Sequence, residues 1–294
     1  MRHPVLPALA TAALAILLAG IPAGAPAGDP PTAGAAAPAA APAAEPGADF
    51  GPLFAVHVDE VRPEMVAEFE RLNARENRGL HGILRRHGQP VTPVWEIATS
   101  EAVYLGLRSR KSLTDFDTPS TVPDSVAALF ATVTDPLDGP IHATLRSHHN
   151  EIWRFLRGDS YYPAHPRYSG PTPGYLQLTS ERVVPAQADL YSALVDSLKA
   201  ALATTDYPFT VLLFASRYGD GAYHFLWEAD SREAFVGAGD RAAVLRAAYG
   251  DRAADRMLAQ WQACLAGAAT VDAAPRRAYA DLDSTLAWPG VPAP

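Results

Sequence analysis

Alternating apolar and polar residues mark a series of short strands in the N-terminal half of the chain, with helical spacing between them. Val66, Phe69 and Leu72 recur at helical spacing after Pro63, and proline suits the first turn of a helix. The pattern predicts strands at 53–58, 94–99, 102–107 and 151–156, and helices at 63–84, 124–133 and 137–145. The predicted order is therefore strand, helix, strand, strand, helix, strand.

The C-terminal half shows the same order of elements. Its pattern predicts strands at 175–179, 209–216, 222–228 and 277–282, and helices at 185–202, 232–235, 241–249 and 251–265. The stretch AYHFLWEADSREAF begins at Ala222 and is similar to AVYLGLRSRKSLTDF, which begins at Ala102, 120 positions earlier (222 − 102 = 120). A repeated order of elements is the sequence signature of a repeated structural unit. We therefore predict a tandem duplication.

The repeated order, β-α-β-β-α-β, is that of a ferredoxin-like unit. A four-stranded antiparallel sheet with helices on one face leaves its other face bare, and two such sheets cover each other when they stack. The sequence predicts an α+β fold in which two tandem ferredoxin-like units pack their sheets face to face as an α/β barrel. The first unit is expected at 50–160 and the second at 174–294, joined by an inter-repeat linker at 161–173.

On this order and patterning, residues 50–286 resemble the dimeric α/β barrel superfamily, with two units in one polypeptide. That superfamily includes stress-responsive barrel proteins and NIPSNAP-like, antibiotic-biosynthesis monooxygenase-like and chlorite-dismutase-like proteins. The resemblance includes no diagnostic catalytic motif, so it implies a fold more than an activity.

The N-terminal residues carry the features of an export signal. An almost wholly apolar run at 5–20 follows Arg2 and His3 and ends at the small residues Ala25 and Ala27. We expect a signal peptide at 1–27, an Ala/Pro-rich disordered linker at 28–49, and a secreted or periplasmic protein. An uncleaved membrane anchor is the alternative for the apolar run.

Charge limits the partners of the folded part. The chain has a formal net charge of −8, and it lacks the large Lys/Arg cluster that nucleic-acid binding requires. We therefore expect no nucleic-acid partner, and membrane contact only through the N-terminal export segment. The single cysteine, Cys264, cannot form an internal disulfide, so the fold must depend on its hydrophobic core.

Strand alternation selects a set of candidate site residues. Polar side chains that lie opposite the apolar side chains of each predicted strand are expected to share the interior between the two sheets. These candidates are His57, Glu96, Tyr104, Arg154, Gln177 and His224. They fit three interpretations: polar groups that hydrogen-bond one another, a ligand pocket, or a catalytic site. In the catalytic site, His57 or His224 would be a general base, and Tyr104 or Arg154 would position an anionic substrate.

The densest cluster of candidate metal ligands is His148, His149 and Glu151, with His142 upstream. Its spacing matches no regular zinc motif, and a solvated corner between helix and strand explains it, so no metal site is predicted. A chlorite-dismutase-like haem site would need an axial histidine in the second unit, where His224 is the only strand histidine. No cofactor is predicted.

Three functional hypotheses remain. The first is an exported barrel protein that binds a small, mainly apolar molecule between its sheets. The second is a cofactor-independent or haem-assisted oxygenase-type enzyme that uses interior histidines, and the third is a protein-interaction module. These patterns do not separate an enzyme from a binding protein.

Overall fold

The structure is a computed structural model that describes residues 51–89, 94–117, 122–170, 172–219 and 221–276. The predicted signal peptide at 1–27, the linker at 28–49 and the predicted strand at 277–282 lie outside the described residues. Within the described part of the chain, no helix is both long and apolar enough to cross a bilayer.

The N-terminal half has the predicted order of elements. These are β1 (Leu53–Val61), η1 (Pro63–Met65), α1 (Val66–Arg86), β2 (Trp95–Thr99), β3 (Val103–Arg110), α2 (Thr114–Asp117), α3 (Asp124–Thr144) and β4 (Leu145–Phe155). Two predicted helices are one continuous helix, α3, which runs through Pro136 and Pro140. Strand β4 begins well before the predicted start at residue 151, and this brings His148 into the sheet.

The C-terminal half follows the same order with more helices. Its elements are η2 (Arg157–Asp159), β5 (Tyr175–Val183), η3 (Pro185–Gln187), α4 (Ala188–Thr204), β6 (Val211–Tyr218), β7 (Tyr223–Ala229), α5 (Arg232–Ala238), α6 (Arg241–Tyr249), α7 (Asp251–Ala263) and β8 (Leu265–Pro275). Strand β8 was not predicted, because its alanine-rich sequence has only two β-branched residues, Thr270 and Val271, and no aromatic residue. Its pairing with β5 and β2 decides its conformation.

The eight strands of the described residues form one closed antiparallel barrel in the order β1-β3-β2-β8-β5-β7-β6-β4. The two four-stranded sheets join at β2–β8, where Ile97 pairs with Pro275, and at β4–β6, where Phe155 pairs with Phe214. The two sheets thus pair edge to edge as well as packing face to face. Each of the strands that the structure describes therefore has a hydrogen-bonded neighbour on both sides. The tandem duplication itself stays a prediction.

Apolar side chains fill the middle of the barrel. Phe214 of the second half lies 5.5 Å from Phe54 and 5.2 Å from Phe155 of the first half, measured between ring centroids. Trp95, Val56 and their neighbours complete this buried cluster. The two halves therefore share one core inside the barrel.

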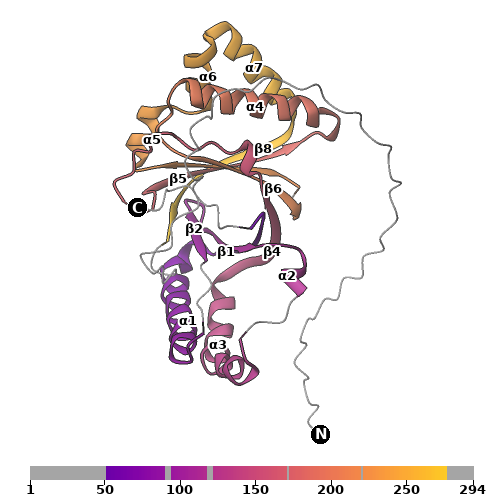
Figure 1. The fold of residues 1–294 in the computed structure, drawn as a ribbon. Helices are drawn as coiled ribbons and strands as arrows, with labels where there is room; N and C mark the ends of the chain where they lie inside the picture. The colour runs from indigo at the N-terminus through magenta and orange to yellow at the C-terminus, as the bar shows by residue number, and fades with distance from the viewer. Residues whose placement is uncertain (1–50, 90–93, 118–121, 171, 220, 277–294) are drawn as a thin grey trace, which may run out of the picture. The chain divides into compact units, whose positions relative to one another are not determined.

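The outward faces of the two sheets carry separate helical layers, α1 and α3 on the first half and α4, α6 and α7 on the second (Figure 1). In the second layer, aromatic residues fill the space between sheet and helices, including Tyr191, Phe225, Trp227 and Trp261. Buried Glu181 accepts hydrogen bonds there from Tyr191 and Trp261 and forms an ion pair with Arg241 at 2.6 Å. The first helical layer, by contrast, leaves a cavity between the helices and the sheet.

Candidate functional site

A cavity of about 500 Å³ lies between the outer face of the first-half sheet and helices α1 and α3. Strands β1 to β4 form its floor and the two helices form its roof. Its lining combines apolar and polar side chains: Ala55, His57, Asp59, Phe69, Asn73, Glu76, Asn77, Val94, Glu96, Tyr104, Leu105, Gly106, Arg108, Asp138, Ile141, His142, Leu145, His148 and Asn150.

Gly106 lies on the floor of the cavity and adds no side chain to it. In the sheet register, Gly106 of β3 lies between His57 of β1 and Glu96 of β2. A Cβ atom at this position would lie 3.7 Å from Val94 Cγ1 and 3.8 Å from His57 Cβ, which are ordinary contacts. The backbone here therefore accepts a Cβ atom, and glycine leaves space between two titratable groups, His57 and Glu96.

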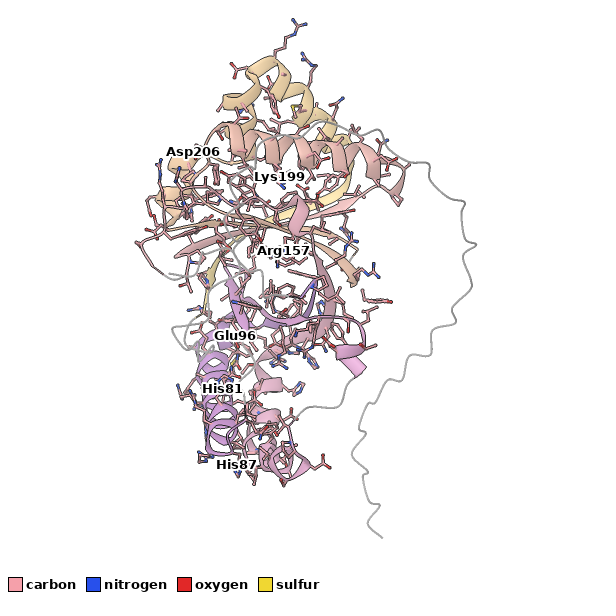
Figure 2. The ribbon with its side chains drawn as sticks, in the orientation of Figure 1. His81, His87, Glu96, Arg157, Lys199 and Asp206 are labelled. Carbon is pink, nitrogen blue, oxygen red and sulfur yellow. The ribbon has the colours of Figure 1, made fainter. Side chains whose placement is uncertain are left out.

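Glu96 forms one wall of the cavity. Figure 2 labels it on β2, above His81 of helix α1. Asn77 of α1 donates a hydrogen bond of 3.3 Å to Glu96 Oε1. Burial raises the pKa of Glu96 to about 8 by disfavouring the charged carboxylate, and the Asn77 hydrogen bond opposes this rise only in part. Near neutral pH, this carboxyl group is therefore close to the balance between its acid and base forms.

His57 forms the facing wall. Its Nδ1 lies 2.8 Å from Asn150 Oδ1, and its Nε2 lies 3.0 Å from Asp59 Oδ1. The hydrogen bond to Asp59 raises the pKa of His57, opposed by burial. His148 lies next to His57, with ring centroids 5.9 Å apart, and is itself 4.8 Å from the ring of His142. Imidazole and carboxylate groups are thus concentrated at this end of the cavity.

Arg108 and Tyr104 border the cavity on β3, each two residues from Gly106. Arg108 stays charged at neutral pH, and no described carboxylate lies within ion-pair distance of it. The Tyr104 hydroxyl donates a 2.8 Å hydrogen bond to Glu70 Oε1. Burial raises the pKa of Tyr104 to about 12, so this hydroxyl keeps its proton.

The six residues selected from the sequence do not share one space. His57, Glu96 and Tyr104 line the cavity, which lies on the helix side of the sheet and not between the sheets. Arg154 is exposed on β4, and Gln177 lies on the outward face of β5, paired with Asp272. His224 is buried inside the barrel, stacked on Trp153 with 3.9 Å between ring centroids.

A change of face between β3 and β7 explains the position of His224. The offset of 120 aligns Tyr104 with His224, which implies that both point to the same side. Strand β3 directs Leu105 and Leu107 into the barrel, whereas β7 directs His224 and Leu226 inward. A shift of one residue moves every side chain of a strand to its other face.

The sequence analysis missed several cavity residues that adjoin those it selected. Asp59 follows His57 at the spacing of one strand face, and this signal was available in the sequence. Gly106 and Asn77 belong to the cavity only because helix α1 packs over the sheet, and the sequence does not show this packing. Asp59 and Asn77 add polar groups to the cavity lining, and Gly106 leaves space beside them.

The structure divides the predicted histidine cluster between two sides of β4. His148 faces the cavity, where ligand atoms of His57, Asp59 and His148 lie within 4.8 Å of one another. His149 and Glu151 form a separate pair, with His149 Nε2 3.1 Å from Glu151 Oε1 and with Trp153 Nε1 donating to Glu151 Oε2 at 2.6 Å. Alternate residues of a strand point to opposite faces, which accounts for this division.

The residues around His224 do not fit a haem group. An axial ligand needs open space in front of its coordinating nitrogen. His224 is 3% exposed, and one face of its ring is covered by Trp153. Its Nδ1 lies 2.9 Å from Ser180 Oγ, and its Nε2 is buried. No step through haem is derived for this chain.

Comparison with known proteins gives structural neighbours only. No protein-family model matches the chain, and no curated protein matches it. Similar solved structures include a protein proposed to be a monooxygenase from Lactobacillus acidophilus, with 9% identity, a TM-score of 0.46, and coverage of 83% of this chain and 99% of that one. An anthrone oxidase-like protein has 15% identity and a TM-score of 0.46, and covers 76% of this chain and 91% of its own. A chlorite dismutase variant from Candidatus Nitrospira defluvii, in complex with cyanide, has 11% identity and a TM-score of 0.45, and covers 78% and 92%.

Proposed function

We propose that this protein is an enzyme that binds a small, weakly acidic molecule in the cavity above Gly106 and transfers a proton between that molecule and Glu96. The observation that carries this proposal is the cavity itself, a space of about 500 Å³ with a partly buried carboxyl group at its wall and a glycine at its floor. Cavities of this size suit small molecules.

In this proposal Glu96 is the base, and Arg108 stabilises the anion that forms. The ionised Glu96 takes a proton from a carbon or hydroxyl group of the bound molecule, and the electron pair of that bond stays on the molecule as an anion. Arg108 stabilises this anion, because a residue two positions along a strand from Gly106 is about 7 Å away, within the reach of one small molecule. Returning the proton from Glu96 completes the cycle. A base with a pKa near the working pH suits this task.

This proposal relocates the predicted ligand site. The sequence placed an apolar ligand between the two sheets, where the structure has packed aromatic side chains such as Phe54, Trp95 and Phe214. The helix-side cavity offers both an apolar part, including Phe69 and Ile141, and the polar groups that orient a ligand. A ligand of mixed character therefore suits it better than a purely apolar one.

Cofactor-independent oxygenation is a second candidate, because the same proton abstraction would begin it. An anion is more easily oxidised than its conjugate acid, so dioxygen could convert a bound CH₂ group into a carbonyl group. One oxygen atom would enter the product and the other would leave as water, with no external reductant. Consumption of dioxygen in the presence of a bound ligand, measured with an oxygen electrode, would separate this reaction from simple proton transfer.

Gly106→Val tests whether the cavity binds the ligand. Valine favours strands, its Cβ would meet only ordinary contacts, and its methyl groups would enter the cavity, so the variant should fold and melt within a few degrees of the wild type. Its side chain occupies the cavity floor, so the rise in melting temperature produced by a panel of phenols and aryl ketones should be lost. Gly158→Ala, at an open position outside the cavity, is the control. Equal ligand-induced shifts in wild type and Gly106→Val would contradict the proposed site.

Glu96→Gln tests the chemistry. For an aryl ketone that binds, exchange of its acidic C–H protons for deuterium in D₂O can be followed by NMR. Wild-type exchange should rise with pH up to about pH 8, because ionised Glu96 is the base. Glutamine should still bind the ketone but slow the exchange at least about 100-fold. Unchanged exchange in Glu96→Gln would eliminate Glu96 as the base.

Export is a separate proposal, supported by the apolar run at 5–20 and the small residues that follow it. Expression of the full chain in a bacterium, followed by cell fractionation and N-terminal sequencing, tests it. A mature protein that begins near Gly28 outside the inner membrane is expected. A full-length chain retained in the cytoplasm would contradict it.

A further inference from the structure

We infer that His57, Asp59 and His148 form a binding site for a divalent first-row transition-metal ion at the end of the cavity opposite Glu96. The ligand atoms of these three side chains lie within 4.8 Å of one another. The inference goes beyond the proposed function and needs no role for Glu96.

The backbone brings these residues together. His57 and Asp59 are two residues apart on β1 and share the face that lines the cavity. His148 of β4 is the direct cross-strand partner of Asp59. Cross-strand partners on one face have Cβ atoms about 5 Å apart. Strand register, more than any single side-chain rotamer, therefore fixes the three positions.

His57 Nε2 and Asp59 Oδ1 face each other and are both atoms that bind cations. Asn150 Oδ1 lies 2.8 Å from His57 Nδ1 and can only accept, so it holds a ring hydrogen on Nδ1. Nε2 donates to Asp59 when no ion is bound, and it is the nitrogen that would release its proton to bind one. This Nε2 points at Asp59 Oδ1, 3.0 Å away. Two ligands held at right angles by bonds of about 2.1 Å are about 3.0 Å apart, so an ion that displaces the shared proton would find these two atoms at a suitable separation.

Asn150 supplies the orienting contact that metal-binding histidines require. Such histidines usually donate their second ring N–H to a carbonyl or carboxylate group, which fixes the tautomer and the direction of the ring. His148 is exposed, so a small rotation about its side-chain bonds brings a ring nitrogen to the other two ligands. Asp59 is partly buried and needs no such movement.

The ligand set indicates the class of metal. Two imidazoles and one carboxylate suit zinc, iron, cobalt and similar ions, whereas magnesium and calcium prefer all-oxygen sites. Three protein ligands would leave coordination positions open, as in catalytic metal sites, and all three residues line the cavity. A molecule bound in the cavity would therefore be able to reach the ion.

The experiment uses full-length mature protein without a polyhistidine tag, stripped with EDTA and dialysed. Titration with Co²⁺ should produce visible d–d absorption that saturates at one ion per chain, and calorimetry with Zn²⁺ should give the same stoichiometry. Asp59→Asn and His148→Ala should each weaken binding roughly 100-fold, and Asn150→Ala roughly 10-fold. Equal melting temperatures of these variants and the wild type in EDTA would show that the fold is kept.

His149→Ala is the matched control, because His149 neighbours His148 but pairs with Glu151 on the other face of β4. It should bind Co²⁺ like the wild type, as should Glu96→Gln, so a failed metal site and a failed proton-transfer site give different results. Absence of saturable Co²⁺ binding to the wild type would overturn the inference. Binding that survives Asp59→Asn and His148→Ala, or that is lost in His149→Ala, would also overturn it.

Discussion

Glu96 and Glu181 show how the surroundings of a side chain decide its chemistry. Glu181 is 2% exposed, but Arg241, Tyr191 and Trp261 all contact its oxygens, so its charge is compensated in the folded protein. The Glu96 carboxyl group accepts a hydrogen bond from the Asn77 amide, which lowers its pKa less than burial raises it. A carboxyl group that is desolvated without compensation binds its proton more tightly, which makes Glu96 the reactive one of the two.

Replacing Glu96 with glutamine should change how stability depends on pH. The pKa of Glu96 is about 8 in the folded protein, above the value of 4.5 for a free side chain. Between these values the folded chain holds a proton that the unfolded chain releases. The corresponding stability is fully present below about pH 4.5 and is lost as the pH rises through 8.

Glutamine keeps a neutral amide at every pH, so Glu96→Gln should match the wild type near pH 5. It should exceed the wild-type free energy of unfolding by about 1–3 kcal/mol near pH 9, a range reduced because the side chain is partly open to the cavity. Urea unfolding at both pH values measures this difference, and exposed Glu101→Gln in the neighbouring turn is the control. Parallel pH curves for Glu96→Gln and the wild type would contradict the raised pKa.

The ends of helices α5, α6 and α7 are set by nearby residues in the sequence. Gly239 and Gly250 separate them, with positive φ values of 90° and 75° that favour glycine. Ser231 and Asp240 cap α5 and α6, each accepting a hydrogen bond from a backbone N–H three residues later. These signals lie in the sequence itself, which is why this region was predicted with little error up to β8.

Asp240→Ala should remove the N-terminal cap of α6. Asp240 Oδ1 accepts a hydrogen bond of 2.9 Å from the Ala243 backbone N–H, which otherwise has no partner within the helix. We expect a loss of about 1 kcal/mol in the free energy of unfolding, measured by urea titration. Asp196→Ala, an exposed position inside α4, should change stability by less than half of that. A cost at Asp240 no greater than at Asp196 would argue against the cap.

At the scale of the whole folded part, the closed barrel joins two halves that also have separate helical layers. Phe214 of β6 packs on Phe54 of β1 and on Trp153 and Phe155 of β4, and the pairing of β4 with β6 also joins the two halves. The second helical layer is filled by aromatic residues, whereas the first leaves a polar cavity. The likeness in order of elements therefore does not extend to the chemistry of the two layers.

Phe214→Ala should weaken both halves together. Deleting this buried ring leaves a cavity in the shared core, and we expect a loss of about 3–5 kcal/mol in the free energy of unfolding. Because the core is shared, hydrogen exchange of amides in β1 and in β7 should accelerate by the same factor. Val236→Ala, at an exposed position on α5, is the control. Faster exchange confined to β7 would show that the halves unfold independently.

The sequence alone determined the order of strands and helices up to α7, because periodicity, turn residues and helix ends are local properties. It also selected His57, Glu96 and Tyr104, since a polar residue within an apolar strand is visible without a fold. Tertiary structure decided which face of each strand is inside, and so it placed His224 in the barrel and the other three against the helices. Side-chain direction depends on strand register, and register is set by partners distant in the sequence, as the pairing of Asp59 with His148 shows.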